Sequence, residues 1–343
     1  MDEHPEDEQA LDELLTRPSR KLCESITEIS SPLIVLGAGG KMGPSLCVLA
    51  KRAAEQAGTP LEVVAASRFS DESKRAWLEA RGIATISIDL LDRHSLDQLP
   101  TARDVVYLAG MKFGTRADPS LTWAINTLAP AHAAEHFKAA RITALSTGNV
   151  YPLVEVSGGG SIESDRPGPV GEYANAALAR ERLFEHFAGR PGGPRVALIR
   201  LNYATELRYG IPVDIANRIS AGKAIDVTTG YFNCIWQGDA NEMVLRSLPL
   251  ATAPASRWNL TAPGVHSVRH AACKLGELLA REPAFLGEES ATALLSNPAK
   301  ICDTLDPPPT SFETILKRTA HWVAHGGAQL GKETHFEVRD GEF

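Results

Sequence analysis

Three glycines at a fixed spacing, Gly37, Gly40 and Gly43, stand between a short apolar run and a helical pattern. The run Leu33–Leu36 is too short for a helix, so it predicts a strand that enters a tight turn. The helix that follows presents free N–H groups and its positive dipole end to an anion. In this motif the first glycine permits the turn, the second lets backbone approach a pyrophosphate, and the third allows close helix packing. The pattern predicts a nucleotide-cofactor site that includes Gly37, Gly39, Gly40, Lys41, Met42 and Gly43.

The end of the second predicted strand distinguishes NAD from NADP. An acidic residue there accepts hydrogen bonds from the ribose 2′-hydroxyl, whereas a positive residue pairs with a 2′-phosphate. This chain has Ser67 and Arg68 at that point and no acid before Asp71. Arg68, aided by the Ser67 hydroxyl, favours NADP over NAD. The alternatives are a solvated surface arginine or one that stacks on adenine.

Two further strand ends supply candidate cofactor contacts. Asp89 ends the third strand, where its carboxylate can accept the adenine amine, and Leu90 lies beside it. Ala109 and Gly110 end the fourth strand, where small residues let a cofactor lie against backbone.

Apolar strands alternate with amphipathic helices along the first 200 residues. Buried strands joined by right-handed helical crossovers indicate a doubly wound, Rossmann-type α/β fold with a parallel sheet. A glycine-rich turn without function is the alternative to a cofactor loop, and the repeated strand–helix units argue against it. The predicted strands are residues 61–66, 83–88, 104–109, 142–146 and 195–201, and the main later helices are residues 119–138 and 172–187. Ser70 is the predicted N-cap of a helix over Asp71–Arg81.

The chain divides into three predicted parts. Residues 1–30 form an acidic N-terminal extension, a solvated tail with one or two amphipathic turns whose leucines can dock on the body. Residues 31–202 form the dinucleotide-binding domain, with the loop 152–170 on the cap side. Residues 203–343 form a smaller mixed α/β substrate cap with one helix or strand that returns to the core. The docking leucines are Leu11, Leu14, Leu15 and Leu22.

Composition excludes several functions. The net charge is −7 and no Lys/Arg stripe exists, so nucleic acid is not an expected partner. No apolar run reaches about 18 residues, so no membrane span is expected. The five scattered cysteines predict reduced thiols in a cytoplasmic protein. Neither the cysteines nor the pair His321 and His325 have zinc-ligand spacing, so no metal site is expected.

Several weak motifs occur in one order along the chain. They are the glycine pattern, Asp89–Asp92, Tyr107–Gly110, Asn126–Ala129, Ser146–Tyr151, Arg200–Asn202, and Trp258–Leu260 followed by Ser267–Arg269. Together they resemble the extended short-chain dehydrogenase/reductase superfamily, in its NAD-dependent epimerase/dehydratase branch. The resemblance covers Leu33 to about Phe285.

The resemblance implies a Ser/Thr–Tyr–Lys mechanism. The tyrosine acts as acid/base on a substrate hydroxyl or carbonyl, the lysine lowers the tyrosine pKa, and the hydroxyl residue polarises the carbonyl. Thr147 matches the hydroxyl residue and Tyr173 matches the tyrosine, but Ala177 stands where the lysine is expected. A tyrosine with its ordinary pKa of about 10 is a poor base at neutral pH.

Two explanations compete for the missing lysine. In the first, another cation enters the site, and Lys112 in the loop 110–113 is the candidate; the alternative for Lys112 is a solvated loop lysine. In the second, Tyr173 only binds ligand and catalysis is weak, altered or absent. The first predicts an NAD(P)-dependent oxidoreductase, epimerase or dehydratase that acts on a hydroxyl or keto group. The second predicts a cofactor-binding regulator.

The substrate prediction depends on Phe232. Members of the branch that use nucleotide sugars commonly place an arginine before the segment that resembles residues 233–239, but this chain has Phe232 there. A phenyl ring cannot clamp a diphosphate, so a free sugar, sugar acid or other small polyol is favoured. Arg208 is read as an exposed cap arginine. The helices 119–138 and 172–187 resemble the pair through which this superfamily often dimerises, which predicts a homodimer.

Overall fold

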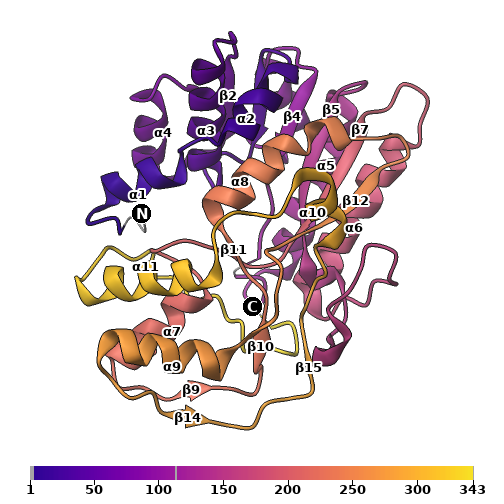
Figure 1. Cartoon of the computed structure of the whole chain (residues 1–343). Coiled ribbons are helices and arrows are strands. Elements are labelled where there is room, and N and C mark those ends of the chain that lie inside the picture. The colour runs from indigo at the N-terminus through magenta and orange to yellow at the C-terminus, as the bar shows by residue number, and fades with distance from the viewer. Residues whose placement is uncertain (1–3, 113, 343) are drawn as a thin grey trace.

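A seven-stranded parallel sheet forms the centre of the computed structural model, which describes residues 4–112 and 114–342 (Figure 1). The strand order is β12-β7-β5-β4-β1-β2-β3, and every neighbouring pair is parallel. The strands are β1 (Leu33–Leu36), β2 (Val63–Ser67), β3 (Ala84–Ser87), β4 (Asp104–Tyr107), β5 (Arg141–Thr147), β7 (Arg195–Leu201) and β12 (Ser256–Leu260). The predicted Rossmann-type α/β fold is confirmed.

Helices cover both faces of this sheet because its strands alternate apolar side chains between two cores. Leu33 and Val35 of β1 join the core beneath one set of helices, whereas Ile34 and Leu36 join the core on the opposite face. The first set contains α2 (Arg20–Ser25), α3 (Gly43–Ala57), α4 (Glu72–Glu79) and α8 (Gln237–Arg246); the second contains α5 (Pro119–His136) and α6 (Gly171–Ala188).

The C-terminal part of the chain forms a smaller lobe, below the sheet in Figure 1. Its own apolar core lies between three helices: α7 (Ile211–Ser220), α9 (Val268–Leu279) and α11 (Phe312–Ala324). Short strand pairs border it: β9 (Ile225–Asp226) with β14 (Phe285–Leu286), and β10 (Tyr231–Phe232) with β13 (His266–Ser267). Between these elements the chain returns to the main sheet as β12, beside β7. The domain boundaries stay a prediction.

Three further contacts tie the two halves of the chain together. The loop after β5 forms β6 (Val154–Glu155), which pairs with β15 (Thr292–Ala293). The segment after β7 forms β8 (Ala204–Thr205), which pairs with β11 (Ile235–Trp236). Helix α10 (Ala299–Leu305) places Ile301 and Leu305 in the core beneath α3 and α8.

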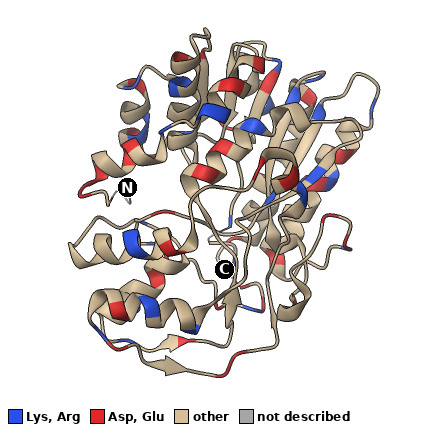
Figure 2. Ribbon diagram, in the orientation of Figure 1, with Lys and Arg blue, Asp and Glu red and all other residues tan. Residues whose placement is uncertain are grey.

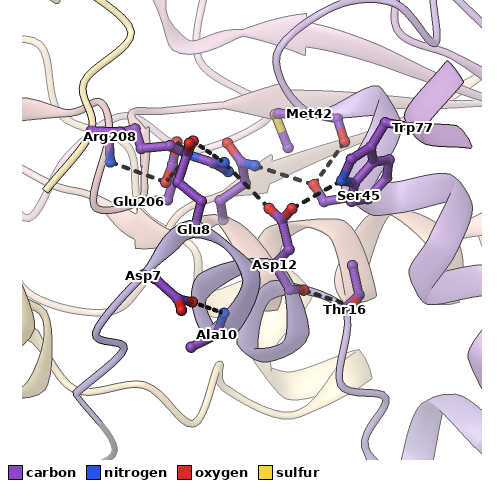
Figure 3. Close-up of polar contacts among 12 residues, drawn as sticks. Asp7, Glu8, Ala10, Asp12, Thr16, Met42, Ser45, Trp77, Glu206 and Arg208 are labelled. Carbon is purple, nitrogen blue, oxygen red and sulfur yellow. Dashed lines mark hydrogen bonds and ion pairs between the residues drawn. The ribbon is translucent and has the colours of Figure 1, made fainter. Parts of the chain in front are cut away.

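The N-terminal segment lies against both lobes. Helix α1 (Glu8–Leu15) buries Leu11 and Leu15 in the core of the smaller lobe, and Leu22 of α2 lies in the core beneath α3. Asp12 accepts hydrogen bonds from Trp77 Nε1 of α4 at 3.0 Å and from Arg208 Nη1 at 3.3 Å (Figure 3). The docking of the leucines is confirmed, and α1 and α2 are not a solvated tail.

Two side-chain predictions are wrong. Arg208 is not an exposed cap arginine: its side chain is 17% exposed and pairs with Glu206 and with Asp12 of α1. Ser70 is not the N-cap of α4; that residue is Asp71, whose carboxylate accepts from the Ser73 N–H at 3.1 Å. A carboxylate is the stronger acceptor for the free N–H groups of a first turn.

Charges of both signs are interspersed over the helices visible in Figure 2. Among the described residues, no helix has the length and apolar character that a bilayer crossing needs.

Candidate functional site

Two adjoining cavities lie where the parallel strands end, the edge at which open α/β sheets bind ligands. The first has a volume of about 400 Å³ and the second about 240 Å³. Gly37, Gly40 and Leu108 line both cavities, so the glycine loop and the end of β4 separate them.

The glycine loop holds the geometry that an anion site needs. Gly37 has φ +80°, and a Cβ on it would lie 2.7 Å from the backbone nitrogen of Ala109. A Cβ on Gly43 would collide with the Ala38 carbonyl, so Gly43 allows the start of helix α3 to pack closely against the glycine loop itself. Helix α3 begins at Gly43 and its N-cap Met42 provides no side-chain acceptor. Within residues 4–112 and 114–342, no side chain caps the N–H groups of this first turn, as an anion-binding helix terminus requires.

The predicted adenosine-side residues meet in the first cavity. Its lining includes Ser67, Arg68, Asp89, Leu90, Ala109 and Gly110. Asp89 accepts a hydrogen bond from the Leu91 N–H at 3.0 Å. Lys74 of α4 does not line the cavity, but its Nζ donates to the carbonyl of the lining residue Gly39 at 3.2 Å. Its signal in the sequence was weak, because Lys74 meets Gly39 only once α4 packs beside the loop.

The second cavity brings together the predicted reaction residues. Thr147, Tyr173 and Lys112 line it with Lys41, Met42, Asn149, Asn202, Tyr203 and Tyr209. Thr147 ends β5, and its hydroxyl donates to Asn149 Oδ1 at 3.0 Å. Tyr173 lies in the first turn of α6 and is 8% exposed. Thr147 and Tyr173 therefore line one cavity from two elements.

Lys112 is half-buried rather than solvated. Its Nζ donates to the Thr334 carbonyl at 3.4 Å and lies 5.8 Å from the centre of the Tyr203 ring. Burial lowers the pKa of Lys112 to about 8, so the side chain is mostly charged at pH 7.

Position 177, where the resemblance implies a lysine, lies in a packed apolar cluster. Ala177 is fully buried and packs in a small cluster with Val150, Tyr151 and Tyr173. One turn further along α6, Arg180 lies on the same helix face as Tyr173 and Ala177, because the spacing is i, i+4 and i+7. Sequence reasoning missed this residue.

Arg180 directs a buried guanidinium to the end of β4. Its Nη1 donates to the Ala109 carbonyl at 3.0 Å, and a Cβ on Gly110 would collide with the same nitrogen. The residue is 4% exposed, and among the described residues its Nε has no hydrogen-bond partner. A second cation thus lies directly behind the residues that line the first cavity.

A buried ion pair fixes α6 against the sheet. Arg200 of β7 donates to both carboxylate oxygens of Glu181, at 2.9 and 2.7 Å. Its Nη1 donates to the Tyr151 hydroxyl at 2.7 Å, which in turn donates to Asn259 Oδ1 of β12 at 2.8 Å. Arg200 and Glu181 are 1% and 0% exposed. This network supports the helix that carries Tyr173.

Phe232 belongs to the core of the smaller lobe. It is 1% exposed, and its ring centre lies 5.8 Å from those of His266 and Phe312 and 6.5 Å from that of Phe336. Phe336 belongs to the C-terminal tail, which Thr334 anchors by donating to Asp214 at 2.6 Å. The residue at the diphosphate position of the resembled branch is thus packed against this chain's own tail.

The same tail holds a cluster that sequence reasoning missed. Ligand atoms of Glu333, His335 and Glu337 lie within 4.8 Å of one another. Arg218 Nη2 is 3.5 Å from both carboxylates, so an ion-pair network accounts for the acidic residues. We propose no metal there.

No family model matches this chain, and no curated protein sequence matches it. Solved structures share its fold at low identity. MoeE5 in complex with UDP-glucose and NAD is 18% identical, with 87% of this chain and 99% of that chain covered and a TM-score of 0.68. A UDP-glucose 4-epimerase of Thermus thermophilus in complex with NAD is 18% identical, with 84% and 97% covered and a TM-score of 0.66.

A dehydratase shows the same likeness. DesIV, a dTDP-glucose 4,6-dehydratase from Streptomyces venezuelae with NAD bound, is 18% identical, with 85% and 96% covered and a TM-score of 0.71. The resemblance predicted from the motifs is therefore confirmed at the level of the fold, which this chain shares with NAD-dependent epimerases and dehydratases.

Proposed function

We propose that this protein is an NAD(P)-dependent oxidoreductase of the epimerase/dehydratase kind that acts on a hydroxyl or keto group of a small sugar-like molecule. The observation that carries the proposal is the placement of the glycine loop, Thr147 and Tyr173 around adjoining cavities at one sheet edge. The solved structures that share the fold include complexes with NAD, and this adds support.

The residues present fit a pyridine dinucleotide. The uncapped first turn of α3 would hold the pyrophosphate, and Arg68 with Lys74 would lie near the ribose 2′-position. When bound, the nicotinamide supplies hydride transfer. NADP is the proposed form because these two cations lie near the end of β2, and because the carboxylate of Asp71, the first acidic residue after Arg68, is committed to capping α4.

Thr147 and Tyr173 would handle the proton. The Thr147 hydroxyl would hydrogen-bond the reacting oxygen, and Tyr173 would give or take its proton. Since tyrosine needs a nearby cation to act as a base at neutral pH, Lys112 would supply positive charge from the cavity wall. Arg180 is a second candidate for the same task, on the helix face of the missing lysine.

Variants of Lys112 and Arg180 test whether either cation takes the role of the lysine that is absent at position 177. A Tyr173 base loses support when the nearby positive charge is removed, so the pH–rate profile of kcat for alcohol oxidation is expected to move to higher pH. The pH–rate profiles of Lys112→Met and Arg180→Met identify which cation acts, with Arg180→Lys as the charge-conserving control. Wild-type profiles in both methionine variants would refute the replacement.

Arg68→Ala tests the cofactor form. Loss of a charge-assisted bond to a 2′-phosphate is expected to weaken NADP binding roughly 10- to 100-fold, with NAD affinity changed less than about threefold. Titration of protein fluorescence with both nucleotides measures this. An equal loss for NAD and NADP would show that Arg68 stacks on adenine instead.

The whole proposal is tested with a panel of sugars, sugar acids and polyols. Absorbance of the reduced nicotinamide reports net oxidation, and NMR analysis of the products detects redox-neutral epimerisation. The second candidate, a cofactor-binding regulator, is favoured by Ala177 at the lysine position. Nucleotide binding without any product across the panel would support the regulator.

Two further expectations stay proposals. A homodimer through α5 and α6 is supported by the exposed apolar side chains of Trp123 and Leu128 on α5, and light scattering measures it. The cytoplasmic setting is supported by cysteines that remain free thiols.

A further inference from the structure

Lys41 places an ammonium group in the second cavity. The residue belongs to the glycine loop, but its Nζ donates to the Ala204 carbonyl at 3.4 Å and lies 3.3 Å above the centre of the Tyr209 ring. Both contacts belong to the segment that follows β7, and Lys41, Ala204 and Tyr209 line the same cavity as Thr147 and Tyr173. Among the described residues, Lys41 forms no ion pair.

Lys112 reaches the same cavity from the loop after β4. Its charge is one of the causes that lower the pKa of Lys41, so the two ammonium groups are close enough to repel each other. Burial is the main cause and brings the pKa of Lys41 to about 7. The surroundings of Lys41 thus disfavour its charged form, and the attraction of a bound anion would offset this effect.

The carboxylates whose charges act on these lysines also interact with other residues. Glu206 accepts from Arg208 Nε at 3.2 Å. Asp214 accepts from the Thr334 hydroxyl at 2.6 Å. Glu337 lies 3.5 Å from Arg218. The positive charge of Lys41 is therefore only partly balanced by the described part of the chain.

We propose that Lys41 and Lys112 form an anion subsite that binds the carboxylate of the substrate, which makes the substrate a small polyhydroxy acid rather than a neutral sugar. This inference rests on the proposed function and narrows its substrate class. A nucleoside diphosphate is disfavoured, because Phe232, at the position where the resembled branch commonly has an arginine, is buried against Phe336 of the tail. The cavity volume of about 240 Å³ suits a small acid whose hydroxyl carbon reaches Thr147 and Tyr173.

Because binding is linked to the protonation of Lys41, the subsite predicts a pH dependence of acid binding. The groups that face Lys41 are Glu206 and Asp214, which raise its pKa, Lys112 and Lys332, which lower it, and the Tyr209 ring. A bound carboxylate raises the pKa of Lys41 towards its ordinary value. At pH 8 the acid should therefore bind with proton uptake, and its affinity should fall as the pH rises above about 7.

Pairs of ligands that differ only in the acid group test the proposal. Calorimetry of the NADP-loaded protein compares D-gluconate with D-glucitol, D-galactonate with galactitol, and L-threonate with L-threitol, in buffers of different ionisation enthalpy. At least one acid is expected to bind 10-fold or more tightly than its matched alditol, with proton uptake at pH 8. Lys41→Met should weaken that acid roughly 10- to 100-fold and NADP less than about threefold, whereas Lys41→Arg should retain most of the preference.

The outcomes separate this inference from the proposed function. The subsite would be overturned if no acid bound more tightly than its matched alditol. It would also be overturned if Lys41→Met weakened NADP binding instead of acid binding, and this result would assign Lys41 to the cofactor pyrophosphate. Inorganic phosphate that competes with the acid in wild type but not in Lys41→Met supports the subsite. Preferred acid binding without turnover would keep the subsite and reject the enzyme. Circular dichroism and melting temperature confirm that each variant folds.

Discussion

Tyr173→Phe is expected to lower turnover by roughly 10²-fold or more while nucleotide affinity stays near wild type. The substitution removes one hydroxyl from a side chain that is 8% exposed and lines the cavity with Thr147. The phenyl ring keeps its packing against Val150 and Ala177, so the loss reports the proton rather than the fold. Initial rates on the best substrate of the panel measure it.

Tyr203→Phe is the matched control. Tyr203 lines the same cavity, but burial raises the pKa of its hydroxyl well above the ordinary value. This hydroxyl is therefore hard to ionise at neutral pH, and its loss is expected to change kcat less than about tenfold. Equal effects of the two substitutions, or unchanged turnover in Tyr173→Phe, would reject Tyr173 as the proton donor.

Arg200→Met is expected to destabilise the protein by about 3–5 kcal/mol, because it leaves the carboxylate of Glu181 buried without its cation. The same change removes the donor to the Tyr151 hydroxyl and so loosens α6, β7 and β12. The melting temperature should fall by on the order of 10 °C. Thermal and urea unfolding, followed by circular dichroism, measure the change.

Two further variants serve as controls for the stability loss in Arg200→Met. Arg20→Met breaks an exposed pair with Glu24, whose side chains are 91% and 61% exposed, and should cost less than about 1 kcal/mol. The double variant Arg200→Met with Glu181→Leu removes the orphaned charge and should regain part of the lost stability. A single Arg200→Met variant as stable as Arg20→Met would show that the network does not support α6.

The sequence could predict the sheet because its signals are local. Each of β1, β5, α6 and β7 carries its own apolar pattern and breaks, and the predicted bounds lie within two residues of those in the structure. The strand ends then followed from the parallel topology, which brings residues as distant as Ser67, Gly110 and Tyr173 to one edge of the sheet.

What the sequence could not predict are contacts between distant segments. Arg180 donates to a carbonyl 71 positions earlier in the chain, and Arg208 meets Asp12 across 196 positions. No periodicity reports such pairs, because each depends on how whole elements pack. The absence of a lysine at position 177 and the candidate cation Lys112 could both be read from the sequence, whereas Arg180 was found only in the folded chain.

The most direct measurement is a calorimetric titration of the purified protein with NADP and NAD. Binding in the micromolar range is expected, with NADP the tighter ligand, and Gly37→Ala should abolish it because the new Cβ would lie 2.7 Å from the Ala109 nitrogen. Gly58→Ala is the matched control: its φ is also positive, at +67°, but no atom lies within 4 Å of the new Cβ. Wild-type protein that binds neither nucleotide at millimolar concentration would contradict the account.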